Sequence, residues 1–444
     1  MGKKEKRDNP GYVGAKKFWG WQARAVSAAW CNMIVMSFLM IYCTSMLGVS
    51  PVVIGTLLAI SKVVDAVTDL TAGIMVDRTR TKFGVGRPYE FAVIGLWAGT
   101  WAMFSVPGGL GMVGKYIWIM LSYIVVNAIF NTFLGANQNA YMVRAFNTNE
   151  QRVKVVSLGG IVVMVCTMIV SMIFPTLQKT ICVNLSGWSK VMAMFAVLGT
   201  VLGMLRFLLV KEDYPIEAEG EKPLQMSDVM LVLKNNKYVY MIAIMYLLYN
   251  LVNGMGVATY YYTYVYGDIS VMGLMSLLGM VYLPLMAFIP ALNKKLTIGQ
   301  ITIIGCLMNA AAGLLMFFAG RNIAMLIAAT ILTGIGSMPM ISLTDLMMMD
   351  CATYNQQKNG RRMDGVISAI KGFAGKVGGA LGSVVIGALL SLGGFISTVD
   401  GAAVTQPDSA LFMIRVSAGI VPVVLYLLTA VIMKSYKVES EIQK

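Results

Sequence analysis

Two aspartates four residues apart, Asp65 and Asp69, lie inside a hydrophobic segment of the sequence, in the stretch SKVVDAVTDL. On a helix this spacing places both carboxylates on one face, with the hydroxyl of Thr68 beside them. Carboxylate and hydroxyl oxygens are hard ligands that suit a small hard cation. Two close carboxylates can also share one proton, because both cannot easily ionise together. The pattern therefore predicts a site for either a small metal ion or a proton.

Charges at membrane depth are costly, on the order of 2.5–3.5 kcal/mol per group. The cost suggests a coupling role, since the pair must be neutralised before the protein changes state. The alternative is a static ion pair. Lys62 lies three residues before Asp65, close enough on a helix to neutralise it permanently. The sequence leaves both interpretations open.

The chain that surrounds these charged residues is strongly hydrophobic. Of its 444 residues, 57% are hydrophobic and 13% are charged, and the mean hydropathy is +0.72. A soluble protein carries roughly 25% charged residues, so most of this surface is expected to face a lipid bilayer. The net charge of +14 comes from basic residues in short segments between apolar runs. This distribution is typical of membrane topology and not of nucleic-acid binding.

Few side chains are suited to metal or covalent chemistry. The sequence contains no histidine, and its six cysteines form no CxxC pair. We therefore expect no zinc site, no disulfide framework and no cofactor other than a coupling cation. The polar segments are also too short for a catalytic domain, so we expect no enzymatic activity.

Apolar runs of about 20 residues, the length of a membrane-spanning helix, recur along the whole chain. Most Lys and Arg residues fall in alternate connections between them, which places both termini in the cytoplasm. We expect a multi-pass protein of the plasma membrane, the inner membrane of a bacterium. The twelve predicted spans are 20–47, 51–77, 88–106, 113–145, 153–178, 187–210, 237–266, 270–292, 297–319, 322–352, 363–395 and 411–433.

A polar stretch in the middle divides these spans into two sets of six. We predict a six-helix bundle over 1–210, a cytoplasmic linker with a short amphipathic helix over 211–236, and a second six-helix bundle over 237–444. The fold class is then an all-α membrane protein with the plan of the major facilitator transporters.

Further polar residues inside predicted spans suggest a solute site. Asn127, Asn131, Thr132 and Asn139 lie in the fourth span, and amides in lipid are expensive unless they face a cavity or another helix. Such amides suit a hydroxyl-rich solute, and Trp101 in the third span can supply an aromatic face.

The eleventh span carries two lysines in SAIKGFAGKVGGALG, Lys371 and Lys376. An ammonium group at this depth requires a carboxylate or a substrate oxygen. The glycines around Lys376 allow neighbouring helices to approach closely.

Two long motifs carry a resemblance to a known family. The second-span segment DAVTDLTAGIMVDRTRTKFGVGRPY and the segment MDCATYNQQKNGRRMDGVISAIKGFAGKVGGALG closely resemble those of the glycoside–pentoside–hexuronide:cation symporters, the melibiose permease-like family of the major facilitator superfamily. TNEQR and YYYTYVYG agree in order and spacing but are weak alone.

The resemblance implies twelve helices, alternating access and solute uptake coupled to Na⁺, Li⁺ or H⁺. Asp65 and Asp69 match the family's cation-site acids, and Thr68 and Thr132 match neighbouring ligand positions. Lys376 matches the lysine that links the cation and sugar sites.

The chain also departs from the galactoside-transporting pattern. Where that pattern has two further acids, a tryptophan and an arginine, an ungapped alignment places Ala29, Gly135, Asn139 and Gly160. A different solute is therefore expected, and the more positive cavity mildly favours a uronide. With fewer carboxylates to coordinate a metal ion, coupling to H⁺ becomes more favoured relative to coupling to Na⁺.

We thus expect a monomeric symporter that imports a sugar, glycoside or uronide together with H⁺ or Na⁺. The expected cation site is Asp65, Asp69, Thr68 and Thr132, with a possible Na⁺ at the two acids. The expected solute site is Lys376, Asn127, Asn131, Asn139 and Trp101. The alternatives are a transporter of a lipid-like or aromatic solute, and a transport-inactive membrane sensor.

Overall fold

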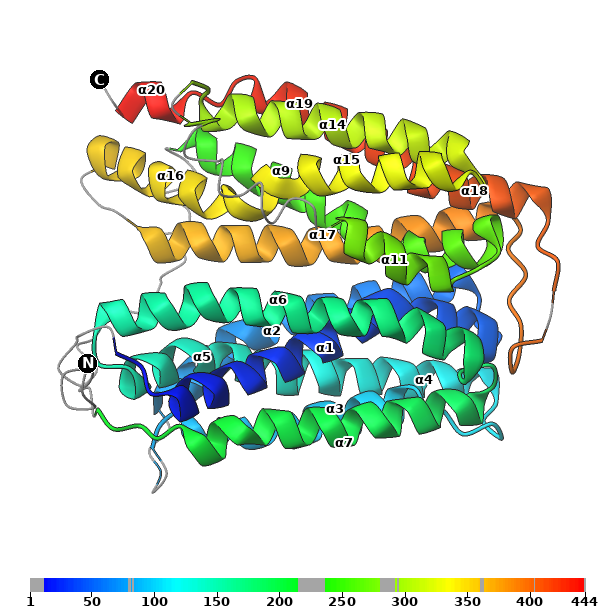
Figure 1. Ribbon diagram of the computed structural model, residues 1–444, viewed down its shortest axis with the longest axis horizontal. Helices are drawn as coiled ribbons and strands as arrows, with labels where there is room; N and C mark the ends of the chain where they lie inside the picture. The colour runs from blue at the N-terminus through cyan, green and yellow to red at the C-terminus, as the bar shows by residue number, and fades with distance from the viewer. Residues whose placement is uncertain are drawn as a thin grey trace. The chain divides into compact units, whose positions relative to one another are not determined.

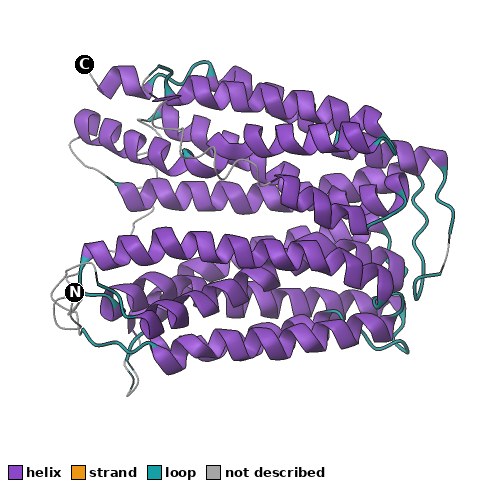
Figure 2. Ribbon diagram, in the orientation of Figure 1, coloured by secondary structure: helices purple, strands orange, loops and turns teal. Residues whose placement is uncertain are grey.

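The computed structural model describes residues 12–78, 81, 84–214, 236–279, 292–293, 295–359, 363–402 and 404–442. Within these residues, all the regular secondary-structure elements longer than an isolated bridge are helices (Figures 1 and 2). These residues divide into two compact units. The first unit runs to Val49, resumes at Ile60 and includes 398–402. The second unit takes in Ser50–Ala59 and the other described residues from 236 onward. The predicted linker helix lies in 215–235, outside the described residues.

The helices of the first unit are long and mostly apolar. They are α1 (Ala15–Met46), α2 (Pro51–Arg78, whose first residues belong to the second unit), η1 (Arg87–Phe91), α3 (Ala92–Met103), α4 (Met112–Tyr123), η2 (Ile124–Asn131), α5 (Thr132–Ala145), α6 (Asn149–Thr180) and α7 (Leu185–Leu209).

The helices of the second unit are more often interrupted. They are α9 (Lys237–Gly254), α10 (Val257–Tyr260), η3 (Tyr261–Tyr266), α11 (Ser270–Gly279), α14 (Ile298–Ala319), α15 (Ile323–Ser342), α16 (Thr344–Asn359), α17 (Asp364–Leu392), α18 (Asp408–Ala418), α19 (Ile420–Met433) and α20 (Val438–Ile442). The interruption between α9 and α10 is a residue with positive φ, Gly256 (+57°), a conformation that favours glycine.

Nine helical stretches in the described part of the chain are long and apolar enough to cross a membrane. The protein is therefore a multi-pass helical membrane protein. Described helices also occupy the predicted second, third and eighth spans, as α2, α3 and α11, but these do not meet the same criterion. The number of twelve spans stays a prediction.

Local sequence signals explain where several helices begin. Thr148 accepts a hydrogen bond from the backbone N–H of Gln151 at the start of α6, and Asn184 does the same for Gly187 in α7. Thr297 and Gln300 form a reciprocal capping box at α14. Such caps satisfy backbone N–H groups that the first helical turn leaves without partners.

Aromatic residues fill the core of the first unit. Trp97 is fully buried, and its Nε1 donates to Ser27 Oγ over 2.7 Å, while Ser27 Oγ donates to the carbonyl of Gly199 over 2.6 Å. A Cβ at Gly199 would lie 2.0 Å from the Trp97 ring. This glycine therefore allows α7 to pack directly on α3.

A carboxylate ties the segment before η1 to the end of α7. Glu212 accepts hydrogen bonds from the backbone N–H groups of Val85, Gly86 and Arg87, over 2.9, 2.8 and 2.7 Å. Arg87 in turn donates through Nε and Nη2 to the carbonyl of Phe207. Together these bonds fix the entry to η1.

Replacing Glu212 with alanine is expected to lower the free energy of unfolding by about 1.5–3 kcal/mol, because hydrogen bonds to a charged group are lost. Denaturation in mixed micelles measures this loss. Asp213→Ala is the matched control. Asp213 makes an exposed ion pair with Lys17, and such pairs contribute at most about 1 kcal/mol. Equal losses in the two variants would contradict the assignment.

Candidate functional site

Asp65 and Thr132 are in direct contact within the first unit. The Thr132 hydroxyl lies 2.9 Å from Asp65 Oδ1 and 3.2 Å from the backbone carbonyl oxygen of Asn127. Asp65 comes from the middle of α2, and Thr132 is the first residue of α5. The hydroxyl hydrogen therefore has two acceptors, one charged and one neutral.

A π-helical segment positions this threonine. The predicted fourth span is a continuous helix, but its central residues, Ile124–Asn131, wind as the π-helix η2. A π turn places one extra residue in each hydrogen-bonded ring and often occurs at functional sites. The Thr132 side chain bonds the carbonyl of Asn127, five residues back. Ordinary helical periodicity does not predict this arrangement.

Two further buried groups lie close enough to Asp65 to interact with it electrostatically. Lys62, one turn earlier on α2, is 7% exposed and is attracted by the carboxylate. Tyr123, the last residue of α4, is 3% exposed. The carboxylate thus has a cation and a threonine hydroxyl near it.

The remaining predicted cation ligands are only partly described. The Thr68 hydroxyl donates to the backbone carbonyl of Asp65 over 3.0 Å, within α2. Asp69 lies in the same helix, but its side chain is outside the described residues. Among the described residues, no three His, Cys, Asp or Glu side chains are grouped to hold a metal ion.

Two of the amides predicted for the solute site, Asn127 and Asn131, lie close to Thr132 in the sequence. Asn127 is buried, and its Nδ2 donates to the carbonyl of Tyr123 over 3.2 Å. Asn131 Nδ2 donates to Asn32 Oδ1 on α1 over 3.3 Å. The amides of η2 therefore bond to their own helix and to α1.

The other predicted solute residues are placed differently. Trp101 on α3 is 43% exposed, and no described hydrogen bond or ring contact joins it to the asparagines or to Asp65. Asn139 lies in α5, but its side chain is outside the described residues. Lys376 lies on α17 of the second unit and is half-buried. Lys371, one turn and a half earlier, pairs with Asp345.

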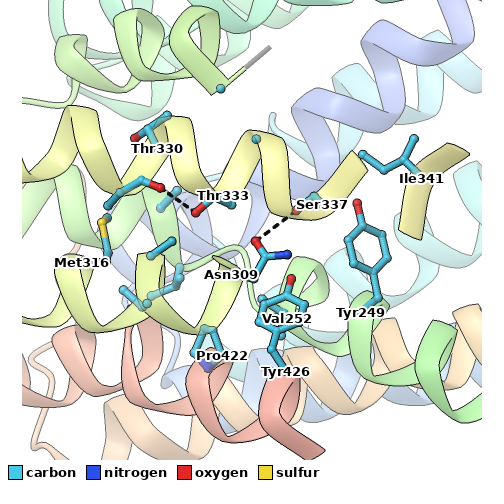
Figure 3. Close-up of a pocket in the computed structure, with 18 of the residues that line it drawn as sticks. Tyr249, Val252, Asn309, Met316, Thr330, Thr333, Ser337, Ile341, Pro422 and Tyr426 are labelled. Atoms are coloured by element: carbon cyan, nitrogen blue, oxygen red, sulfur yellow. Dashed lines mark hydrogen bonds between the residues drawn. The ribbon is translucent and has the colours of Figure 1, made fainter. Parts of the chain in front are cut away.

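The second unit contains a cavity of about 370 Å³ (Figure 3). Its described walls come from α9, α10, η3, α11, α14, α15, α18 and α19. None of the site residues expected from the sequence lies among its described walls.

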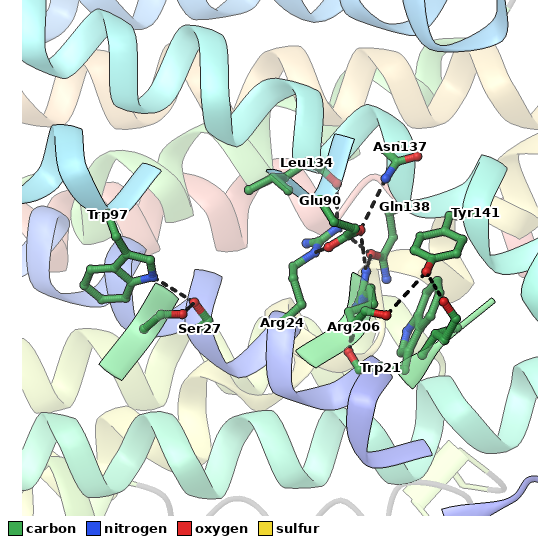
Figure 4. Close-up of polar contacts among 12 residues, drawn as sticks. Trp21, Arg24, Ser27, Glu90, Trp97, Leu134, Asn137, Gln138, Tyr141 and Arg206 are labelled. Carbon is green, nitrogen blue, oxygen red and sulfur yellow. Dashed lines mark hydrogen bonds and ion pairs between the residues drawn. The ribbon is translucent and has the colours of Figure 1, made fainter. Parts of the chain in front are cut away.

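The first unit also contains a buried ionic cluster, made of Arg24, Glu90 and Arg206 (Figure 4). Glu90 Oε2 lies 3.3 Å from Arg24 Nε, and Glu90 Oε1 lies 3.6 Å from Arg206 Nη1. Arg206 and Glu90 are completely buried, and Arg24 is 6% exposed. Because two guanidinium groups face one carboxylate, the three side chains carry a net charge of +1.

Polar neighbours compensate the second guanidinium. Gln138 Oε1 accepts from both Arg24 and Arg206, over 2.9 and 2.8 Å. Backbone carbonyls of Leu134 and Trp21 accept further bonds, and the Arg206 guanidinium lies 3.8 Å from the centre of the Trp21 ring. The cluster therefore joins α1, η1, α5 and α7, and its donors are directed at protein acceptors.

This cluster was not predicted, because Arg24 and Arg206 lie near the predicted cytoplasmic ends of spans, where basic residues are common. The available signal was Glu90, a lone acid at the start of an apolar run.

Comparison with known families gives one match over most of the chain. Residues 23–440 match the family described as MFS/sugar transport protein. Among curated relatives, the chain is 26% identical to the uncharacterized symporter YnaJ of Bacillus subtilis, covering 93% of this chain and 90% of the relative. It is also 26% identical to the isoprimeverose transporter of Lactiplantibacillus pentosus, covering 92% and 86%.

Solved structures show the same fold at low identity. A bacterial homologue of the human lysosomal transporter Spinster, in an inward-facing conformation, superposes with a TM-score of 0.73 at 12% identity, covering 95% of this chain and 97% of that one. The nucleoside transporter NupG superposes with a TM-score of 0.62 at 13% identity, covering 94% and 100%.

Proposed function

Because this chain belongs to the MFS/sugar transport protein family, we propose that it is a secondary active symporter that imports a sugar, glycoside or uronide together with H⁺ or Na⁺. The names of its relatives support the solute class, since they include an isoprimeverose transporter, a raffinose carrier protein and a glucuronide carrier protein homologue. We further propose twelve spans, cytoplasmic termini, a monomer and a bacterial inner membrane.

The observation that carries the coupling proposal is the contact between Asp65 and Thr132. A carboxylate among spanning helices gains from any cation that neutralises it. In the empty site, the Thr132 hydroxyl donates to Asp65. When a metal ion binds, the hydrogen turns to the carbonyl of Asn127, 3.2 Å away, and the hydroxyl oxygen presents its lone pairs to the ion. Asp69 and Thr68 are proposed as further ligands, on the same helix.

Alternating access is proposed to follow from the cost of a charged carboxylate without a partner. With solute bound but no cation, the change of state is unfavourable, whereas the empty protein returns with Asp65 paired to Lys62. Cation binding removes the charge, and solute binding by Asn127, Asn131, Asn139, Trp101 and Lys376 is proposed to complete the transport-competent state. Lys62 is proposed to hold the charged carboxylate between cycles.

Uptake by proteoliposomes tests the proposal. The protein is reconstituted and given radiolabelled isoprimeverose, raffinose or a methyl glucuronide under an inward gradient of Na⁺, Li⁺ or H⁺. We expect at least one sugar to accumulate with at least one gradient and not without it. Flux that is equal with and without every gradient would contradict symport, and no flux of any sugar would favour a membrane sensor.

Replacing Thr132 with valine is expected to distinguish the two coupling ions. With Na⁺, half-maximal uptake should need about tenfold more ion, since about 1.4 kcal/mol of ligand and hydrogen-bond energy is lost. With H⁺, uptake should persist to higher pH, because the charged carboxylate loses a stabilising donor. Thr132→Ser keeps the hydroxyl and should behave as the native protein. Unchanged ion dependence in the valine variant would remove Thr132 from the site.

A further inference from the structure

Among the described residues that line the cavity of the second unit, Asn309 has a polar group without a hydrogen-bond partner. Asn309 on α14 is 2% exposed, and its Oδ1 accepts a hydrogen bond from Ser337 Oγ over 3.3 Å (Figure 3). Its Nδ2 has no partner among the described residues. A buried donor without an acceptor costs about 1–3 kcal/mol. An acceptor supplied from outside would recover this free energy.

Three hydroxyls in the described wall already have partners. Ser337 Oγ donates to Asn309 Oδ1, and Thr330 Oγ1 donates to Met275 Sδ over 3.6 Å. Thr333 donates to the backbone carbonyl of Ala329 over 2.9 Å. No charged residue is among the described lining residues. Asn309 Nδ2 is therefore an unpaired N–H group, and the described residues around it carry no charge.

The remaining wall is apolar and partly aromatic. Tyr249, Tyr262 and Tyr426 contribute ring surface, and alanine, glycine, valine and proline residues fill most of the rest. Aromatic faces pair favourably with other rings in offset or edge-to-face contacts. Apolar cavities tend to remain dry and to accept apolar molecules, since water needs two to four polar partners. This wall is poorly suited to a chain of waters or to a sugar.

The volume also agrees with a small molecule. Sites for organic ligands usually measure about 300–1,000 Å³, and they combine apolar walls with a few polar groups that fix orientation. At about 370 Å³ the cavity lies at the lower end of this range.

We propose that this cavity is a binding site for an uncharged aromatic molecule with two fused rings and one acceptor oxygen, which receives a hydrogen bond from Asn309 Nδ2. The rings lie against the tyrosines, and the oxygen faces the amide. All of its described lining residues belong to the second unit. It goes beyond sugar symport and requires none of the residues proposed for cation coupling.

Saturable binding of tritiated 2-acetylnaphthalene to the purified full chain, measured by a scintillation proximity assay, tests the site. Competition with unlabelled 2-isopropylnaphthalene provides the matched comparison, because the two molecules have the same number of heavy atoms and only the ketone has an acceptor. We expect the ketone to bind about tenfold more tightly. In Asn309→Leu, which has a similar shape and no donor, this preference should disappear.

Two alanine-to-phenylalanine variants locate the site, one in the cavity wall and one beside it. Ala329 lines the cavity and is 2% exposed, whereas Ala328 next to it on α15 is exposed. We expect Ala329→Phe to weaken ketone binding at least tenfold and Ala328→Phe to leave it unchanged. The proposal is overturned if native protein shows no saturable binding, if both ligands bind it equally, or if both phenylalanine variants bind alike. The comparison of the two ligands on native protein needs no variant to fold.

Discussion

Replacing Asp65 with asparagine is expected to abolish sugar accumulation against a gradient, while exchange of sugar across the membrane continues. The variant keeps the size of the side chain and an oxygen that can accept from Thr132. It removes the charge that a cation must neutralise before the protein changes state. Without that charge, the empty and loaded proteins no longer differ in electrostatic cost. Carrier movement is then uncoupled from the ion gradient.

Proteoliposomes measure this outcome as the ratio of internal to external sugar at steady state, which should fall to about one, and as counterflow of labelled sugar, which should persist. Asp213→Asn is the matched control, since Asp213 makes an exposed ion pair with Lys17 and should leave accumulation intact. Full accumulation by the Asp65 variant would refute coupling through this residue and favour a static pair with Lys62.

Replacing Glu90 with glutamine is expected to cost about 3–5 kcal/mol of unfolding free energy, or to prevent accumulation of folded protein. The change removes the only carboxylate of the buried cluster and leaves Arg24 and Arg206 charged and close together. Breaking one partner of a buried ion pair is far more costly than losing an exposed pair. The amide oxygen of glutamine compensates only a small part of that charge.

Unfolding in mixed micelles of increasing denaturing detergent measures the loss. Glu150→Gln in the first turn of α6 is the matched control, and because this residue is exposed it should cost less than about 1 kcal/mol. A triple variant, Arg24→Met with Glu90→Leu and Arg206→Met, should recover much of the lost stability, since buried ionic groups can often be replaced by apolar ones at little cost. A loss below about 1 kcal/mol in Glu90→Gln would show that the cluster is not a charge-balanced unit.

The positions of the helices were largely predictable from the sequence. Apolar runs of spanning length and polar stops such as NTNEQR and NLSG indicate where helices lie, and Thr148 and Asn184 within these stops act as caps. The predicted fourth span begins and ends within one residue of the continuous helix Met112–Ala145. Long periodic elements depend on local sequence, so a single chain is sufficient to predict them.

The candidate site was predictable only in part. The carboxylates of α2 stand out because charge is rare inside an apolar run, and the resemblance placed Thr132 near them. The π turn of η2 was not predictable, because its residues suit an α-helix equally well and packing decides between the two. The cluster of Glu90 with two arginines depends on three helices meeting, and the lone amide of Asn309 becomes informative only once the walls around it are known.

The winding of η2 has a consequence for how this protein can tolerate change. Removing one residue anywhere in Ile124–Asn131 would restore ordinary helical winding, with no break in the helix and no loss of hydrophobicity. Because a π turn takes up one extra residue, α4 and α5 would keep nearly the same orientation, and Thr132 would lose its bond to a carbonyl five residues back. The same deletion within α4 or α5 would turn all that follows by roughly 100° about the helix axis, so η2 is where this span best tolerates the loss of a residue.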